Sequence, residues 1–132
     1  MLHMESETGK LLLEKEGFIM EAKEIIFCNE KVKIKYNNLF LGDYTQRELA
    51  ENIENALSNI KKNAFSGIQI AKRLIPKEYV KKYNISNLWK YNLPNGWRLI
   101  YSIQSYEEIT VLAIIIEYLD HKDYEKRFKY VI

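Results

Sequence analysis

Four side chains near the end of the chain have the chemistry to bind a phosphate group and to move protons. They are Lys90, Arg98, His121 and Tyr124. Arginine donates paired hydrogen bonds to phosphate oxygens, and a well-placed cation stabilises the charge that develops when a phosphodiester is cleaved. Histidine titrates near neutral pH and therefore suits proton transfer. The set predicts phosphodiester chemistry without a metal ion, provided that the fold brings these side chains together.

Other common kinds of catalytic site find little support in the sequence. The chain has one cysteine, Cys28, and two histidines, too few for a zinc cluster and for an intrachain disulfide. It contains no glycine-rich phosphate loop, no HExxH motif and no GxSxG motif. We therefore expect no metal and no other cofactor. The low cysteine count favours a reducing, cytoplasmic setting.

Each candidate residue also has an ordinary structural explanation. An arginine in a strand is commonly solvated or ion-paired, and a histidine in a charged segment is commonly exposed. Tyr124, Phe128 and Tyr130 could pack the end of the chain onto a sheet instead of contacting bases. The functional interpretation therefore depends on the three-dimensional arrangement.

A second group of basic residues could contact the phosphates of a nucleic acid such as RNA. The net charge of +2 is too small to indicate nucleic-acid binding by itself, so this prediction rests on clustering. A solvated surface is the alternative explanation. The residues are Lys72, Arg73, Lys77, Lys81, Lys82, Lys122 and Arg127.

Three aromatic or β-branched runs carry or adjoin the candidate site, with short turn-forming segments between them. The runs are residues 88–93, 97–103 and 109–118, and the turns are residues 94–96 and 104–108. Two tight turns between three runs predict an antiparallel meander. The third run is apolar on both faces, which is typical of a central strand covered on both sides.

Alternation along the second run separates its side chains onto two faces. It places Trp97, Leu99, Tyr101 and Ile103 on one face and Arg98 on the other. If the first two runs pair, Lys90 and Arg98 lie close together across the Pro94-Asn95-Gly96 turn.

The first half of the chain predicts a strand followed by helices. Residues 24–28 form a β-rich run, and Asn29 can cap a helix, although the alternation of residues 31–36 also fits a strand. Thr45 and Glu48 have the spacing of a capping box, which predicts a helix over residues 46–63. The expected core lies between this helix and the meander: Leu49, Ile53, Leu57, Leu99, Tyr101, Leu112 and Ile114.

The length of 132 residues fits one domain, and the composition is globular, with 47% hydrophobic and 29% charged residues. We expect residues 1–19 to be a flexible extension and residues 20–132 to form the domain. No apolar run is long enough to cross a membrane, so no membrane partner is expected. The prediction is an α+β fold in which an N-terminal strand and two helices pack on a twisted antiparallel sheet, followed by a short C-terminal segment. Residues 72–82 are predicted to be a loop with one helical turn.

This order of elements resembles the RelE/ParE superfamily of toxins from toxin–antitoxin systems. The resemblance covers residues 22–130 in layout and is motif-specific from Leu88 onward. The matching segments are LWKYNL at 88–93, NGWRLIY at 95–101, TVLAIII at 110–116 and DHKDY at 120–124. The His121 to Tyr124 spacing is one residue tighter than the commonest form of the family.

The resemblance implies a RelE-like toxin that cleaves mRNA on the ribosome through attack by an RNA 2′-hydroxyl. By position, Arg98 resembles the family's phosphate-binding arginine, and Lys90 resembles a basic residue of the preceding strand. His121 resembles the Arg or His that follows the last strand, and Tyr124 resembles the family's C-terminal tyrosine. The alternative is a ParE-like gyrase inhibitor or an inactive toxin fold that only binds its partner. In each case the resemblance implies a cognate antitoxin, with a heterotetramer as one option for the complex.

Overall fold

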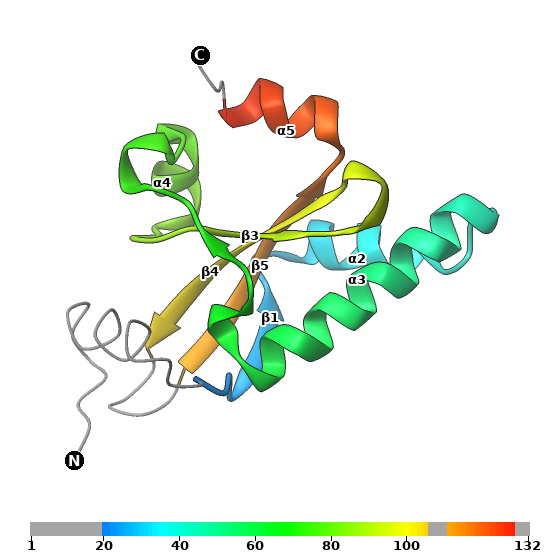
Figure 1. Cartoon of the computed structure of the whole chain (residues 1–132), viewed down its shortest axis with the longest axis horizontal. Helices are drawn as coiled ribbons and strands as arrows, with labels where there is room; N and C mark the ends of the chain where they lie inside the picture. Colours follow the sequence, from blue (N-terminus) through cyan, green and yellow to red (C-terminus); the bar gives the residue numbers. More distant parts are fainter. Residues whose placement is uncertain (1–19, 106–110, 129–132) are drawn as a thin grey trace.

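One mixed sheet with helices on both faces forms the body of the protein (Figure 1). The computed structural model describes residues 20–105 and 111–128. The strand order is β1-β5-β4-β3-β2. The strands are β1 Glu24–Phe27, β2 Ile68–Gln69, β3 Trp89–Asn92, β4 Arg98–Ser105 and β5 Val111–Leu119. The helices are α2 Glu30–Leu39, α3 Tyr44–Lys62, α4 Lys77–Tyr83 and α5 His121–Phe128.

The predicted α+β class is confirmed, but the prediction of a purely antiparallel sheet is wrong. β1 pairs with β5 in parallel, from Glu24 opposite Leu112 to Phe27 opposite Ile115. The chain leaves β1 through the α2–α3 pair and returns to β5 only after the other strands, so it can run beside β1 in the same direction. The prediction also missed β2, whose two residues are exposed and carry no hydrophobic pattern.

The predicted meander is confirmed in β3, β4 and β5, which pair antiparallel in sequence order. The first turn is a short 3₁₀ segment, Pro94–Gly96, in which Asn95 and Gly96 have φ angles of 64° and 82°. Asparagine and glycine tolerate this left-handed region better than other residues. The amide of Leu93 donates to the carbonyl of Trp97 at 2.8 Å and closes the turn. Most of the second predicted turn lies outside the described residues, as does the N-terminal extension 1–19.

Helix α2 settles the ambiguity of residues 31–36, which are helical. The side chain of Asn29 accepts a hydrogen bond from the amide of Val32 at 2.9 Å and so caps the helix, as predicted. Tyr36 and Leu39, three residues apart, are buried on one face. The cap and this buried face favour the helix over the strand that the alternation also allowed.

Helix α3 is confirmed, but it begins two residues earlier than predicted, at Tyr44, and has a different cap. Asp43, not Thr45, caps it: its side chain accepts from the amide of Gln46 at 2.9 Å, and the Gln46 side chain accepts from the amide of Asp43 at 3.0 Å. The capping box therefore begins two residues earlier than the predicted pair of Thr45 and Glu48. Aspartate is at least as good an N-cap as threonine, and glutamine completes the box as glutamate does.

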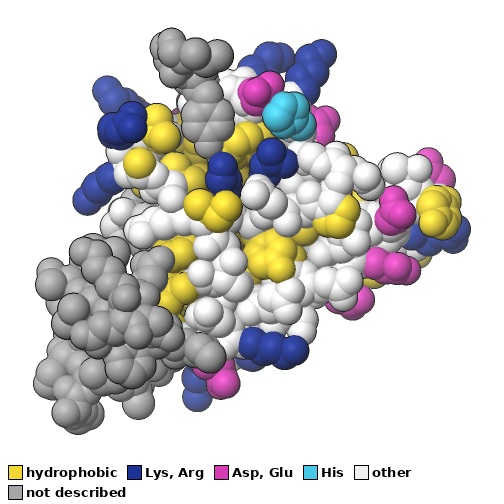
Figure 2. Space-filling model, in the orientation of Figure 1, with side chains coloured by type: hydrophobic (Ala, Val, Ile, Leu, Met, Phe, Trp, Pro, Cys, Tyr) yellow, Lys and Arg dark blue, Asp and Glu magenta, His cyan; other side chains and the backbone are white. Residues whose placement is uncertain are grey.

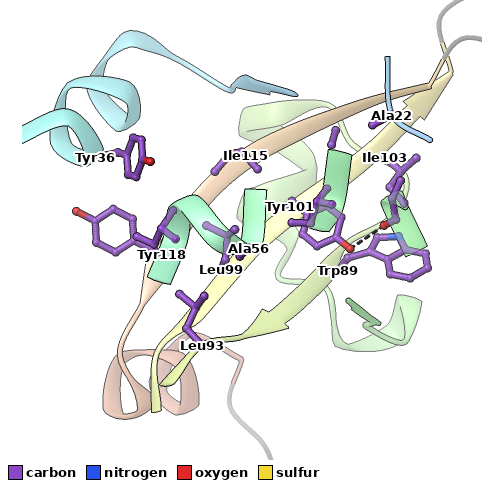
Figure 3. Close-up of a cluster of buried hydrophobic side chains, with 14 of the residues drawn as sticks. Ala22, Tyr36, Ala56, Trp89, Leu93, Leu99, Tyr101, Ile103, Ile115 and Tyr118 are labelled. Atoms are coloured by element: carbon purple, nitrogen blue, oxygen red, sulfur yellow. Dashed lines mark hydrogen bonds between the residues drawn. The ribbon is translucent and has the colours of Figure 1, made fainter. Parts of the chain in front are cut away.

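The first core cluster lies between the sheet and helices α2 and α3 (Figure 3). Leu49, Ile53, Leu99 and Tyr101 are buried there as predicted, and Leu57 is partly buried. Leu112 and Ile114 are half-buried instead, because alternation on β5 turns its other residues toward this cluster. The β5 residues that fill the cluster are Val111, Ala113 and Ile115.

The second cluster lies on the other face of the sheet, under α4 and α5. Its buried aromatic residues are Tyr79 from α4 and Tyr124 and Phe128 from α5, which pack on Ile100 and Ile116 of the sheet. β5 is thus covered on both faces, as its apolar sequence predicted. The C-terminal segment is a helix, and residues 72–82 hold a 3₁₀ turn and α4, more helix than the single turn predicted. In the described part of the chain, no helix is both long and apolar enough to cross a bilayer.

Candidate functional site

The pairing of β3 with β4 brings Lys90 and Arg98 to the same face of the sheet. Lys90 lies opposite Ile100, and Asn92 lies opposite Arg98, so the two cations are diagonal neighbours. Both approach the aromatic ring of Tyr124: the Nζ of Lys90 is 5.2 Å from the ring centroid and the Cζ of Arg98 is 5.3 Å from it. These distances are within the range of cation–π attraction.

The start of α5 fixes the position of the Tyr124 ring. The side chain of Asp120 accepts a hydrogen bond from the amide of Asp123 at 2.8 Å, and its carbonyl accepts from the amide of Tyr124 at 2.8 Å. Tyr124 and Phe128 are one helical turn apart and point toward the sheet, with ring centroids 4.7 Å apart. Tyr124 is only 2% exposed.

Arg98 is held by the turn that precedes it. Its Nη1 donates to the carbonyl of Gly96 at 2.7 Å and to that of Trp97 at 3.3 Å. Its Nε is buried and has no hydrogen-bond partner among the described residues. The guanidinium is therefore oriented before any ligand arrives, which is the requirement for electrostatic stabilisation of a developing charge.

His121 lies beside the same turn. A Cβ atom at Gly96 would be 3.2 Å from the Cβ of His121, so the first residue of α5 and the turn are in close contact. The imidazole is 60% exposed, and its Nε2 lies 3.4 Å from a carboxylate oxygen of Glu125. Figure 2 shows a histidine side chain beside Lys and Arg side chains on this face of the molecule.

The fold thus brings the four predicted site residues into one region. Lys90, Arg98 and Tyr124 are in direct contact, and His121 adjoins the turn that orients Arg98. Because Tyr124 is buried, its phenol is poorly placed to transfer a proton, the role that the sequence suggested for it. Its ring supports the two cations, whereas the exposed imidazole of His121 is the better placed group to transfer a proton to a ligand.

The residues of the second basic group do not form one surface. Lys122 is exposed beside His121. Lys82 lines a small pocket together with Glu117. Lys72, Arg73, Lys77 and Lys81 line a separate groove at α4.

Arg127 is part of a partly buried polar cluster. Its Nη1 lies 2.9 Å from a carboxylate oxygen of Glu117 and 3.2 Å from the hydroxyl of Tyr79, which donates to the same oxygen. Next to Glu117 the pairing of β4 with β5 is irregular: Ile100 lies opposite Glu117 but Tyr101 lies opposite Ile115, so β5 has one extra residue here. Such a bulge turns an additional side chain to one face of the sheet. Burial raises the pKa of Glu117, and this effect exceeds the opposing attraction of Arg127.

Three residues of the site were missed by sequence reasoning. Asp120 caps α5, and the Asp-x-x-Asp spacing of residues 120 to 123 was a usable signal for a helix start. Glu125 is four residues after His121, a spacing that pairs side chains only once α5 is known to be helical. Gly96 was seen as a turn residue, but its contact with His121 is tertiary and had no signal in the sequence.

The described residues contain no group of three or more His, Cys, Asp or Glu side chains that could hold a metal ion. Comparisons with protein-family models, with curated proteins and with solved structures found no match to this chain.

Proposed function

We propose that this protein is the toxin of a toxin–antitoxin module, a RelE-like endoribonuclease that cleaves mRNA on the ribosome without a metal ion. One observation carries the proposal. Lys90 and Arg98, from neighbouring strands, meet over the ring of Tyr124, beside the exposed imidazole of His121. A cationic pair next to a titratable group is the arrangement that phosphodiester cleavage requires.

Arg98 and Lys90 would bind the scissile phosphate. The guanidinium has five N–H donors in a planar fork, and the turn carbonyls that hold Nη1 fix its orientation. Two positive charges over one aromatic ring would stabilise the additional negative charge of the phosphorane. Lys90, as a cation, would orient the phosphate.

In the reaction, the 2′-oxygen of the RNA forms a bond to the adjacent phosphorus, and the bond from phosphorus to the 5′-oxygen breaks. The 2′-hydroxyl proton leaves to water, and protonated His121 donates a proton to the 5′-oxygen. The products are a 2′,3′-cyclic phosphate and a free 5′-hydroxyl. His121 is assigned this step because its imidazole is exposed and adjoins the turn that orients Arg98.

The toxin would act in the cytoplasm, where translating ribosomes provide the mRNA, and a cognate antitoxin would neutralise it. A heterotetramer of two toxins and two antitoxins is one architecture for that complex.

The test is an assay of mRNA cleavage on translating ribosomes, using the wild type, Arg98→Ala and His121→Gln. Arg47→Ala is the matched control, because Arg47 is an exposed arginine on α3, a helix that packs on the face of the sheet opposite Tyr124. We expect wild type and Arg47→Ala to cleave, Arg98→Ala to lose about 10²- to 10³-fold in rate, and His121→Gln to be impaired. Wild-type protein that leaves ribosome-bound mRNA intact would refute the proposal.

The second candidate is a binding module without catalytic activity, including a ParE-like inhibitor of gyrase. The observation in its favour is the burial of the site: Tyr124 is almost inaccessible, and Arg98 is half-buried with Nη1 bonded to the main chain. A gyrase supercoiling assay on the same proteins distinguishes the two. Inhibition of supercoiling with intact mRNA favours the ParE-like function, and inactivity in both assays favours a pure binding module.

A further inference from the structure

A groove beside α4 combines an apolar floor with a cationic rim. Its volume is about 590 Å³. Ile75, Val80 and Ile85 provide the apolar surface. The basic residues that line it are Lys72, Arg73, Lys77 and Lys81.

The packing of α4 explains why the groove face of this helix is exposed to solvent. Tyr79 and Tyr83 lie one helical turn apart, with ring centroids 5.8 Å apart, and Tyr79 packs against Phe128 of α5. Lys77, Val80 and Lys81 have the i, i+3 and i+4 spacing of a different helix face. Anchoring α4 by its tyrosines therefore leaves this face exposed, and Val80 is 46% exposed.

The charge around the groove has one sign. No aspartate or glutamate belongs to its lining, which apart from the residues named above includes only Ser86. Within the described part of the chain, none of the four lining cations forms an ion pair with a carboxylate. Four like charges at a groove repel one another and attract an anionic ligand.

We propose that this groove is a docking site for an acidic amphipathic helix of a partner protein. Leucine or isoleucine side chains on one face of the partner helix would fill the apolar floor, and flanking glutamates or aspartates would meet the cationic rim. The groove is distinct from the Tyr124 site, and the inference goes beyond the proposed nuclease function. It stands whether or not the protein cleaves RNA.

The apolar floor distinguishes a protein partner from RNA. Proteins bind single-stranded RNA by stacking bases on aromatic side chains beside a basic track. The floor here is aliphatic, and the two tyrosines of α4 belong to its other face. Aliphatic side chains offer no stacking platform, but they suit the apolar side of an amphipathic helix.

The experiment measures the binding of labelled helical peptides to the full chain by fluorescence anisotropy. One peptide of about 18 residues, long enough to be helical, carries leucines on one face and glutamates beside them. A second peptide has lysine at every glutamate position. The variants are Val80→Ser, which removes the apolar contact, and the double variant Lys77→Ala/Lys81→Ala, which removes two rim charges.

Exposed residues elsewhere provide matched controls. Ile34 is a β-branched residue on α2 that is 54% exposed, so Ile34→Ser imitates Val80→Ser outside the groove. Lys33 and Lys62 are exposed on α2 and α3, and their double alanine variant matches the loss of charge. Circular dichroism of each variant verifies that the fold is intact.

We expect the glutamate peptide, but not the lysine peptide, to bind the wild type. Val80→Ser should weaken this binding about fivefold, since burial of the exposed half of a valine contributes about 1 kcal/mol. The rim double variant should weaken it about tenfold at low salt, and the two control variants should bind like the wild type.

Other outcomes would overturn the proposal. Equal binding of both peptides, or binding that Val80→Ser leaves unchanged, would exclude this groove as the docking site. A single-stranded RNA oligonucleotide that displaces the peptide and depends on Lys77 and Lys81 but not on Val80 would make the groove a nucleic-acid surface. A dimer in sedimentation that Val80→Ser dissociates would identify a second copy of the chain as the occupant.

Discussion

Replacing Tyr124 by phenylalanine and by leucine separates the two roles that this residue could have. Phenylalanine keeps an aromatic ring beneath Lys90 and Arg98 and removes only the phenolic hydroxyl. Leucine removes both. Because Tyr124 is 2% exposed, we expect its ring, and not its proton, to serve the site.

The contacts of the ring set the size of the effect. Two cation–π contacts, at 5.2 and 5.3 Å, contribute about 0.5–1 kcal/mol each. The ring pair with Phe128 contributes about 0.5–1.5 kcal/mol more. Tyr124→Leu should therefore lower the free energy of unfolding by about 1.5–3.5 kcal/mol, whereas Tyr124→Phe should lower it by about 0.5–1.5 kcal/mol, the net contribution of one hydrogen bond.

Catalysis should divide the variants more sharply than stability. With its ring support lost, the cationic pair is no longer held in place, and a misplacement of about 1 Å at a catalytic group can cost about 10²-fold in rate. Tyr124→Phe keeps the support and should retain cleavage to within about threefold of the wild type, by the same reasoning.

Urea denaturation measures the stability of each variant, and single-turnover cleavage of ribosome-bound mRNA measures its rate. The reasoning fails if Tyr124→Phe folds normally but loses as much activity as Tyr124→Leu. That result would make the phenol a proton donor, despite its burial.

Three further substitutions test the fold around the site. Tyr101→Phe should lower the free energy of unfolding, measured in urea, by about 2–4 kcal/mol. The buried hydroxyl of Tyr101 donates to the carbonyl of Ala64 at 2.7 Å and accepts from the amide of Gly67 at 3.0 Å, and phenylalanine loses both hydrogen bonds. Tyr44→Phe, at a residue that is 72% exposed, should leave the free energy of unfolding almost unchanged. Burial raises the pKa of Glu117, so the folded state binds the proton of this carboxyl more tightly than the unfolded state does. The free energy of unfolding of the wild type should therefore fall, relative to that of Glu117→Gln, as pH rises from about 4 through the raised pKa. A stability difference between the two proteins that does not change with pH would contradict this. Gly96→Ala should lower the free energy of unfolding by about 1–2 kcal/mol, because Gly96 has a φ of 82°. Contact of the new methyl group with His121 should also slow cleavage. Unchanged stability and an unchanged cleavage rate would exclude this contact.

The local patterns of the sequence predicted most of the elements of this fold. Alternation in β4 separated Arg98 from Leu99 and Tyr101, and backbone pairing in the meander then brought Lys90 and Arg98 together. These predictions succeeded because strand alternation and tight turns are determined by residues close together in the chain.

The parts that could not be predicted depend on contacts between distant segments. The parallel pairing of β1 with β5 is determined by the path of the chain around the sheet, which no local pattern records. On β5 every residue from 111 to 116 is apolar, so no alternation of polar and apolar residues indicates which face Leu112 and Ile114 occupy. The packing of Tyr124 and Phe128 onto the sheet was one of two interpretations that the sequence allowed, and the docking of α5, which decides between them, could not be predicted from a charged segment.

We propose that the Lys90, Arg98 and His121 region cleaves RNA by 2′-hydroxyl attack. The chemistry of the RNA ends produced on translating ribosomes by the wild type, Arg98→Ala and the control Arg47→Ala tests this proposal. We expect new fragments with 2′,3′-cyclic phosphate and 5′-hydroxyl ends, made by wild type and Arg47→Ala and reduced about 10²-fold or more by Arg98→Ala. Fragments with 5′-phosphate ends, or wild-type cleavage that Arg98→Ala leaves unchanged, would refute the proposal.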